Sequence, residues 1–453
     1  MLTKQLSDFL HAITYETLSP ETVEVTKMCV EDLIGVALAG TVQPQGAIWN
    51  SYFARKPGDA EATVWAPDWH GSSCDNAAAL NAACAHVIDM DDVHNSSITH
   101  LGAVTIPAAL AVGQKYHRSG KEVIAAIVAG YEIGARIGEA INPSAYHYWH
   151  TTSVVGSFCA AVAAGKLMGL TAEQLLHAIG SAGTQAAGLW QFIVDGAMSK
   201  TLHTANATLC GIRAAELASL GFTAAQDILA GDRGLLGALT PDNKPEALVK
   251  DLEKKEYKIL SNSFKPYACC RHTHSADYCV DLIQREHALD PKRIVRITEY
   301  TYQVAKNTVD APAPATPYGF KFSVQYCIAA ALLHGNLQDS VFTPACTSDP
   351  EAQRLMACTT VVVDDRLEGL YQKDPNQWPH RLEVELDDGR VITQEVIYPF
   401  GDFNNPFDWD AAHTKFHGLT RELLSEDRRD ALTQAVTNLE KLEDVNSLFS
   451  SLA

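Results

Sequence analysis

Apolar residues recur every three to four positions through most of the first 260 residues, a spacing that predicts packed helices. In residues 121–141, Gly130, Gly134 and Gly138 are four residues apart and leave a smooth strip along which a neighbouring helix can approach closely. The pattern therefore predicts a large helical domain. Its expected helices span residues 18–40, 121–141, 153–168, 172–181 and 203–220.

The pattern changes after about residue 260, where β-branched residues alternate with polar ones. Residues 293–305 and 359–364 show this alternation, which is typical of strands. Residues 380–398 predict two strands joined by Asp388-Gly389, which is a strong hairpin signal. This part of the chain is therefore expected to form a sheet.

Helical spacing returns at residues 323–334 and again after about residue 408. We therefore expect a mainly α fold with two domains. Residues 1–262 and 408–453 are predicted to form a large all-helical domain from both ends of the chain, with residues 263–407 inserted as a smaller α+β lid domain. A cleft between two such lobes is a common place for a small-molecule site.

Acidic residues outnumber basic ones by 54 to 35, which gives the 453-residue chain a net charge of −19. A field of this sign repels nucleic acids and anionic membranes, so neither is expected as a partner. Residues 1–15 are amphipathic, unlike a secretory signal, and residues 153–170 carry Lys166 and are short for a membrane span. The 11 cysteines include no CxxC pair, which favours reduced thiols. We therefore expect a cytoplasmic protein.

The densest polar cluster is residues 86–100, HVIDMDDVHNSSITH, which hold three aspartates and three histidines within an apolar context. A solvated loop is the simplest explanation. Aspartate and histidine are also metal ligands, although no second spaced pair completes a known metal pattern. The same residue types suit general acid–base chemistry, because a carboxylate beside an imidazole can fix a group that titrates near neutral pH.

Two further clusters occur at expected helix starts. In residues 146–152, YHYWHTT, His150 and Thr151 precede an Ala- and Gly-rich helix whose free backbone N–H groups would attract a carboxylate or phosphate, although ordinary N-capping explains the same residues. In residues 195–206, Lys200 lies near His203 at the start of another helix. Such a lysine is usually a surface residue, but beside a cleft it would bind a carboxylate.

A fourth cluster, KPYACCRHTH at residues 265–274, places Arg271, His272 and His274 at the expected domain junction. The chain has no GxGxxG after a strand, no GxxxxGK[ST], no GxSxG and no HExxH. Nucleotide-driven, flavin-type and serine-hydrolase chemistry are therefore disfavoured. An acidic protein with imidazole and basic groups in four helical segments suits proton transfer on a small anion, with no cofactor and no metal expected.

These clusters, in this order, resemble the MmgE/PrpD family over nearly the whole chain. The stretches that carry the resemblance are IDMDDVH and THLGAVTIPAALA, WHTTSVVGSFCAAVAAGKLMGL, GTQAAGLWQFIVDGAMSKTLHTANA, KPYACCRHTHSAD and KFSVQYCIAAAL. The resemblance implies a helical domain with a smaller α+β lid, a homodimer, and no cofactor in the lyase members. It also implies small polycarboxylate substrates, since the family includes 2-methylcitrate dehydratase, cis-aconitate decarboxylase and iminodisuccinate epimerase.

Carried over position by position, the family's active-site residues fall on Asp89, His100, His150, Lys200 and His274. The chain departs from the dehydratase pattern, because Asp92-Val93-His94 replaces Asp-Asp-Thr and Thr99-His100-Leu101-Gly102 replaces Trp-Gly-His-Pro. These departures make a methylcitrate dehydratase less probable on sequence grounds. His94 resembles the arrangement of fungal cis-aconitate decarboxylases, so that activity stays open.

The sequence therefore favours an isomerase that inverts a carbon α to a carboxylate, with an iminodisuccinate-like amino-dicarboxylate as substrate. The three histidines would supply acid and base on opposite faces of that carbon, Lys200 would neutralise carboxylates and the developing enolate-like charge, and Asp89 would orient an imidazole. A lyase, either a cis-aconitate decarboxylase or a methylcitrate-type dehydratase, is the alternative, and a non-catalytic polycarboxylate-binding protein is a remote one. The expected substrate-binding residues are His94, Tyr146, Thr151, Arg271 and His272.

Overall fold

The computed structural model describes residues 1–56 and 58–450, and divides the chain into two compact units. Unit 1 comprises residues 1–263 and 408–453, and unit 2 comprises residues 264–407. The predicted mainly α fold is confirmed. Among the described residues, no helix is long and apolar enough to cross a membrane.

Unit 1 is a stack of helices, and the five whose bounds were predicted, α2, α6, α7, α8 and α10, begin and end within a few residues of the expected positions. It also contains two short antiparallel strand pairs, which the sequence pattern did not predict. Its strands are β1 (Ala62–Thr63), β2 (Gly71–Ser72), β3 (Val93–His94) and β4 (Asn262–Ser263). Its α-helices are α1 (Leu2–Ala12), α2 (Pro20–Thr41), α3 (Pro44–Phe53), α4 (Cys74–Ala85), α5 (Gly102–Lys115), α6 (Gly120–Ile141), α7 (Thr151–Leu167), α8 (Ala172–Gly183), α9 (Gln191–Asp195), α10 (Ser199–Ser219), α11 (Leu235–Leu239), α19 (Trp409–Thr420), α20 (Glu426–Thr437) and α21 (Ser447–Ser450).

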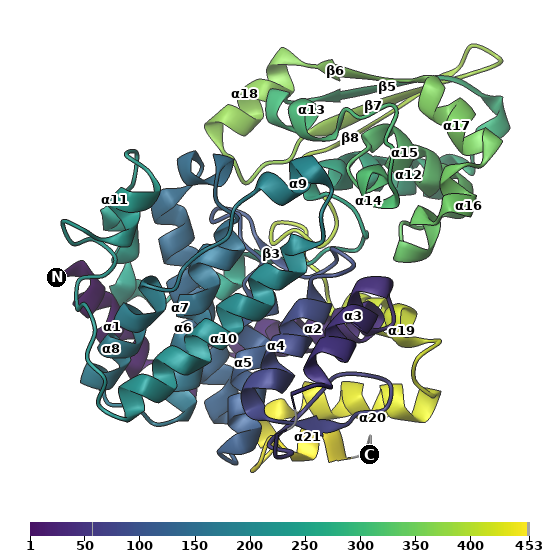
Figure 1. Cartoon of the computed structure of the whole chain (residues 1–453). Helices are drawn as coiled ribbons and strands as arrows, with labels where there is room; N and C mark the ends of the chain where they lie inside the picture. Colours follow the sequence, from purple (N-terminus) through teal and green to yellow (C-terminus); the bar gives the residue numbers. More distant parts are fainter. Residues whose placement is uncertain (57, 451–453) are drawn as a thin grey trace. The chain divides into compact units, whose positions relative to one another are not determined.

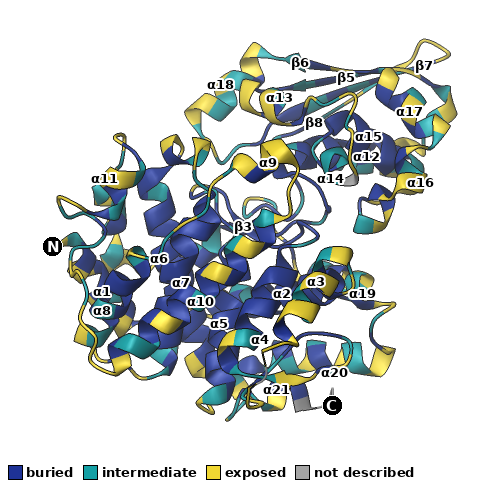
Figure 2. Cartoon of the chain, viewed as in Figure 1, coloured by how far each residue is buried: buried dark blue, intermediate teal, exposed yellow. Residues whose placement is uncertain are grey.

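Helix α7 is the centre of unit 1, since it packs against α5, α6, α8 and α10 and is buried along almost its whole length (Figure 2). Its sequence is rich in alanine and glycine, which allows neighbouring helices to approach closely. The glycine strip of α6 serves the same purpose: a Cβ at Gly130 would meet Thr105 of α5 and the Cys159 carbonyl of α7. The predicted close approach along this strip is therefore present.

The two ends of the chain meet within unit 1, where α19 and α20 pack against α2 (Figure 1). A buried ion pair joins Lys415 of α19 to Asp32 of α2, and the Lys415 ammonium also donates a 2.7 Å hydrogen bond to the carbonyl of Met90. Because Met90 belongs to the polar segment before α5, this lysine connects that segment to both ends of the chain.

Unit 2 is built around a four-stranded sheet with strand order β6-β5-β7-β8, in which only the β5–β6 pair is parallel. The predicted hairpin is confirmed, because β7 and β8 are antiparallel and Gly389 adopts the left-handed conformation, φ 84°, at the turn. Residues 303–305, expected to continue a strand, instead begin a helix. The strands are β5 (Ile294–Thr301), β6 (Thr359–Val363), β7 (His380–Leu386) and β8 (Val391–Val396), and the α-helices are α12 (His274–His287), α13 (Gln303–Val309), α14 (Pro317–Phe320), α15 (Val324–His334), α16 (Pro344–Thr347), α17 (Pro350–Ala357) and α18 (Asp365–Lys373).

The tight packing of α10 on α7 predicts a large effect of one added methyl group. A Cβ at Gly211 would lie 2.6 Å from both the Ala161 nitrogen and the Ser157 carbonyl oxygen, and backbone atoms cannot rotate away. We expect Gly211→Ala to lower the free energy of unfolding by about 1–3 kcal/mol, measured by urea denaturation. The control is Gly237→Ala in α11, where a Cβ meets no atom within 4 Å and we expect no loss. Equal stability of the two variants would contradict the prediction.

Candidate functional site

The polar residues of unit 1 are brought together by three segments: the connection between α4 and α5, the start of α7 and the start of α10. The α4–α5 connection is held in an unusual shape, with Asp89 and Ile98 in the left-handed region at φ 61° and 52°. Residues other than glycine adopt this conformation at a cost of order 1–3 kcal/mol, and such positions cluster at functional sites. The surrounding contacts must therefore fix this segment.

The Asp91 carboxylate contacts two imidazoles. Its Oδ2 atom lies 2.7 Å from His86 Nδ1 and 3.2 Å from His100 Nδ1, and both Asp91 and His86 are buried. Burial alone would raise the pKa of Asp91, but His100 and His86 more than offset this and hold it well below its usual range. Burial lowers the pKa of His86 to about 4, even though Asp91 acts to raise it. At neutral pH the site therefore contains an ionised Asp91 and a neutral His86.

A second pair of imidazoles continues this cluster. The His86 ring is stacked on the His150 ring, with centroids 5.6 Å apart, and His150 Nδ1 lies 2.9 Å from His203 Nδ1 at the start of α10. Burial, followed by the neighbouring imidazoles and Lys200, lowers the pKa of His150 well below its usual value. Burial and Lys200 lower the pKa of His203 to about 4. One nitrogen of the His150–His203 pair therefore donates to the other, and both rings are neutral near pH 7.

Lys200 and Asp89 form a buried ion pair within the same cluster. Lys200 is the second residue of α10, and Asp89 occupies the strained turn before α5. The sequence led us to expect that Asp89 orients an imidazole. The structure places Asp89 against Lys200 and places a second carboxylate, Asp91, against two imidazoles.

The other residues predicted in unit 1 have different surroundings. The Tyr146 ring contacts Trp190, which in turn contacts His150, so Tyr146 lies at the edge of the cluster. The Thr151 hydroxyl donates a 2.6 Å hydrogen bond to the carbonyl of Ile98, a contact that fixes the α4–α5 connection.

His94 is fully buried in β3 and its Nδ1 lies 2.9 Å from the Ser97 hydroxyl. This environment favours support of the α4–α5 connection over the substrate contact that the sequence suggested. The adjacent Asp92 is also enclosed, because it accepts hydrogen bonds of 2.7 Å from Tyr131 and from Asn262. Burial raises the pKa of Asp92 to about 7, against the opposing effect of these hydrogen bonds.

The three remaining predicted residues belong to unit 2. The Arg271 guanidinium donates a 2.8 Å hydrogen bond to the buried Asp402 carboxylate and lies 3.5 Å from His274 Nδ1. His272 faces another group, the Tyr302 hydroxyl at 2.7 Å, and burial lowers the pKa of His272 to about 3. Arg271 and His274 are therefore neighbours within unit 2. The His272 ring instead packs against Tyr302 and Trp378.

Two sets of side chains among the described residues have the composition of metal ligands. They are His86, Asp91 and His100 in unit 1, and Cys269, Asp277 and Cys327 in unit 2, with the donor atoms of each set within 4.8 Å of one another. In the first set, Asp91 already makes a 2.7 Å hydrogen bond to His86 and lies 3.2 Å from His100 Nδ1. In the second, burial raises the pKa of Asp277 and of both thiols, which favours neutral, hydrogen-bonded groups over metal ligands.

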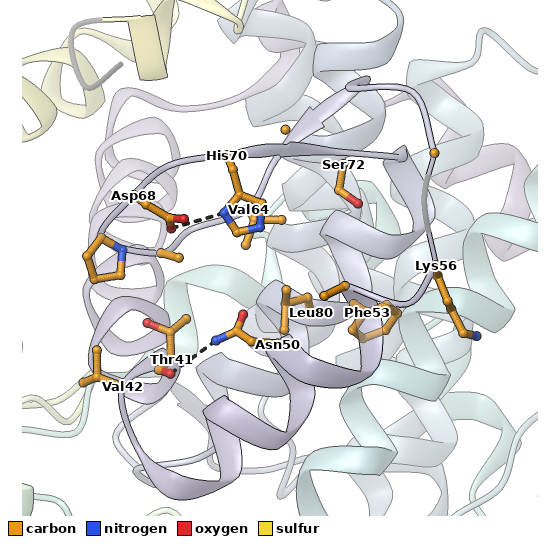
Figure 3. Close-up of a pocket in the computed structure, with 15 residues that line it drawn as sticks. Thr41, Val42, Asn50, Phe53, Lys56, Val64, Asp68, His70, Ser72 and Leu80 are labelled. Carbon is orange, nitrogen blue, oxygen red and sulfur yellow. Dashed lines mark hydrogen bonds and ion pairs between the residues drawn. The ribbon is translucent and has the colours of Figure 1, made fainter.

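A cavity of about 500 Å³ is present elsewhere in unit 1, between the end of α2, α3, the β1–β2 pair and α4 (Figure 3). Its polar groups include Asp68 and His70, which lie 3.1 Å apart, and Lys56 at its rim. None of the predicted site residues lines this cavity.

Sequence reasoning missed three contributors: His86, Asp91 and His203. The first two stand in the predicted Asp- and His-rich segment, but nothing in that segment shows which carboxylate meets which imidazole. His203 follows Lys200 by three residues on a helix, and that spacing places both side chains on one helix face. This spacing was the available signal for His203.

In unit 1, imidazoles, one lysine and carboxylates form one buried cluster, and groups of these kinds transfer protons in enzymes. A family model of the MmgE/PrpD N-terminal domain matches residues 4–248, and a model of the MmgE/PrpD C-terminal domain matches residues 267–441. The chain therefore belongs to the MmgE/PrpD family, as its sequence motifs predicted, and is an enzyme of lyase or isomerase type.

The chain is similar to several curated proteins. It is 29% identical over 403 residues to the cis-aconitate decarboxylase-like protein oryM of Aspergillus oryzae. The aligned region covers 83% of this chain and 82% of that protein. It is 26% identical over 481 residues to the cis-aconitate decarboxylase of Homo sapiens, which covers 100% and 94%, respectively. A similarity of 31% to the mitochondrial 2-methylcitrate dehydratase of Yarrowia lipolytica extends over 111 residues, or 24% of this chain.

The buried Lys200–Asp89 pair yields a prediction on stability and activity. Lys200→Met removes the cation beside a buried carboxylate and should lower the free energy of unfolding by about 3 kcal/mol, measured by urea denaturation. The double variant Lys200→Met/Asp89→Asn leaves no charge at this position and should recover most of that loss. Both variants should lack activity. If Lys200→Met were as stable as the unmodified protein, the ion pair would not contribute to the free energy of unfolding.

The buried His94 predicts a pH-dependent stability. Burial lowers its pKa to about 4, against about 6.5 in an unfolded chain, so between these values only the unfolded chain binds the proton. Its contribution is present above pH 6.5 and is lost as pH falls toward 4, by about 2 kcal/mol between pH 7 and pH 5. Urea denaturation at both pH values should show a smaller drop for His94→Gln than for the unmodified protein. His70→Gln, at an exposed imidazole, is the control, and equal drops for His94→Gln and the unmodified protein would refute the assignment.

Proposed function

We propose that this enzyme is a lyase that removes carbon dioxide from a small unsaturated tricarboxylate of the cis-aconitate type. The proposal is carried by the similarity to a cis-aconitate decarboxylase along the full length of the chain. It is supported by the composition of the cluster in unit 1, where imidazoles and one lysine are buried beside two carboxylates.

The chemistry of such a substrate requires both charge stabilisation and a proton. When the carboxylate on the CH2 arm leaves as carbon dioxide, its C–C bond breaks and the electron pair forms a new double bond to the central carbon. The former vinyl carbon, which is α to another carboxylate, then carries the negative charge and takes up a proton. An enzyme for this reaction needs a cation for the carboxylates and a group that delivers one proton to carbon.

The residues of unit 1 offer candidates for both tasks. Lys200 is assigned to bind a substrate carboxylate, because a charged ammonium in a buried site attracts an anion strongly. His100 is assigned to proton transfer, since its side chain is 16% exposed whereas the other imidazole on Asp91 is fully buried. His150 is the second candidate proton carrier. His274 and the homodimer remain predictions from the family resemblance, whereas Arg271 and the cytoplasmic location remain predictions from the sequence itself.

Epimerisation of an iminodisuccinate-like substrate, which the sequence favoured, also proceeds through a proton at a carbon α to a carboxylate. The relatives support the lyase better than the epimerase, because those with long matches carry the name cis-aconitate decarboxylase. The dehydratase has weaker support, since its similarity extends over 24% of the chain.

Turnover in deuterium oxide separates these reactions. With cis-aconitate, we expect release of carbon dioxide, which mass spectrometry detects. We also expect one solvent deuterium in the product at the carbon α to a carboxylate, which NMR locates. Lys115→Ala, which removes a partly exposed lysine paired with Glu61, is the control and should retain activity. Loss of optical rotation in an amino-dicarboxylate with deuterium exchange, and no carbon dioxide from any tricarboxylate, would replace the lyase by the epimerase.

A further inference from the structure

We infer that Asp91 is a positioning residue that holds His100 with its proton on Nδ1, so that the unprotonated Nε2 takes part in proton transfer. This inference rests on the proposed function only for the reaction in which His100 acts. The orientation and tautomer of His100 are properties of the free protein and can be measured without substrate.

The inference starts from the shared carboxylate oxygen. Asp91 Oδ2 is the atom that approaches both His86 Nδ1, at 2.7 Å, and His100 Nδ1, at 3.2 Å. His86 Nδ1 makes a hydrogen bond to this oxygen, whereas His100 Nδ1 approaches it without hydrogen-bond geometry. A carboxylate oxygen has only lone pairs, so at 3.2 Å it repels a bare nitrogen lone pair and favours the form of His100 with its hydrogen on Nδ1. An imidazole in its neutral form has one N–H, so a ring whose Nδ1 carries that hydrogen has an Nε2 atom with a free lone pair.

The two imidazoles then differ in what they can reach. His86 is enclosed, with its Nε2 buried and its ring stacked on His150. The His100 side chain is 16% exposed to solvent. Of the two nitrogens that Asp91 leaves unprotonated, the one on His100 is therefore the one open to a small molecule, and His86 serves as the second support for the carboxylate.

His100 is also fixed from its main chain. Its backbone N–H donates a 3.0 Å hydrogen bond to the Thr152 hydroxyl, in the first turn of α7. The segment that carries Asp91 is anchored in turn, because the preceding carbonyl of Met90 accepts a hydrogen bond from Lys415. Backbone and ring are therefore held independently, and this limits the rotation of the imidazole.

Several charged or titratable groups surround this arrangement and act on its pH dependence. They are Asp32 of α2, His86 after α4, Asp89 and Asp92 of the α4–α5 connection, His150 before α7, Lys200 and His203 of α10, and Lys415 of α19. Asp91 is the carboxylate among them that contacts His100 directly. Its removal should therefore alter the titration of the site more than removal of another buried carboxylate.

Asp91→Asn tests this role, with Asp92→Asn as the matched control. Asp92 is the next residue, is equally buried, and bonds to Tyr131 and Asn262 and not to an imidazole. Asn at position 91 keeps the shape but removes the charge, so kcat should fall about 100-fold or more, while KM stays within about threefold. Loss of the negative charge lowers the pKa of an adjacent imidazole, so the acid limb of the pH–rate profile should move to lower pH. Asp92→Asn should keep the limb in place.

Two kinetic results would overturn the inference. One is a kcat for Asp91→Asn within threefold of the unmodified enzyme. The other is a reduced kcat with an unmoved acid limb, because a purely structural role would have that effect.

A second measurement needs no change at Asp91 and covers the case in which Asp91→Asn does not fold. In protein labelled with 15N-histidine, two-bond 1H–15N correlations report which ring nitrogen carries the proton. The His100 signal, identified by its loss in His100→Gln, should show a protonated Nδ1 and an unprotonated Nε2. The opposite tautomer would refute the inference. If the unmodified enzyme releases no carbon dioxide while this tautomer is found, the proposed function fails and the positioning role stands.

Discussion

A buried anion next to buried imidazoles is the constraint on which the candidate site depends. Asp91 is fully enclosed, and an ionised carboxylate without donors would cost several kcal/mol in such a place. A hydrogen bond from His86 and the nearby His100 imidazole stabilise it, and both rings must then stay where the carboxylate is. The α4–α5 connection accepts left-handed residues at Asp89 and Ile98 to satisfy this arrangement, and Tyr131 and Lys415 hold it from two other helices.

The same arrangement changes what the net charge means. The chain carries −19 overall, yet its substrate under the proposed function is itself a polyanion. Burial keeps His86 and His203 neutral, so the imidazoles add little positive charge, and the ammonium of Lys200 is already paired with Asp89. A substrate carboxylate must therefore compete with Asp89 for Lys200. This exchange of one carboxylate for another favours ligands with several carboxylates over simple monoanions.

Local patterns in the sequence predicted most of the fold. The three- to four-residue spacing located the long helices, and Asp388-Gly389 located the β7–β8 turn, because these features depend on neighbours in the chain. The site was predicted in composition but not in pairing. Lys200 and Asp89 are 111 residues apart, and their contact depends on how α10 packs on α4 and α5. His150 and His203 are 53 residues apart, and their contact depends on how α7 packs on α10. Asp91 and Asp89 are the same residue type in one short segment, so the sequence alone does not show which of them meets His86 and His100.

The return of residues 408–453 to unit 1 has a consequence for the order in which the protein is made. Helix α19, which covers α2 and supplies Lys415 to Asp32, is made more than 350 residues after α2. Unit 2 is synthesised in between and, as a contiguous stretch, can fold as soon as it emerges. The helical unit must wait, with an uncovered apolar face and an unmatched buried aspartate on α2. The helical unit can therefore complete its core only after α19 has been made.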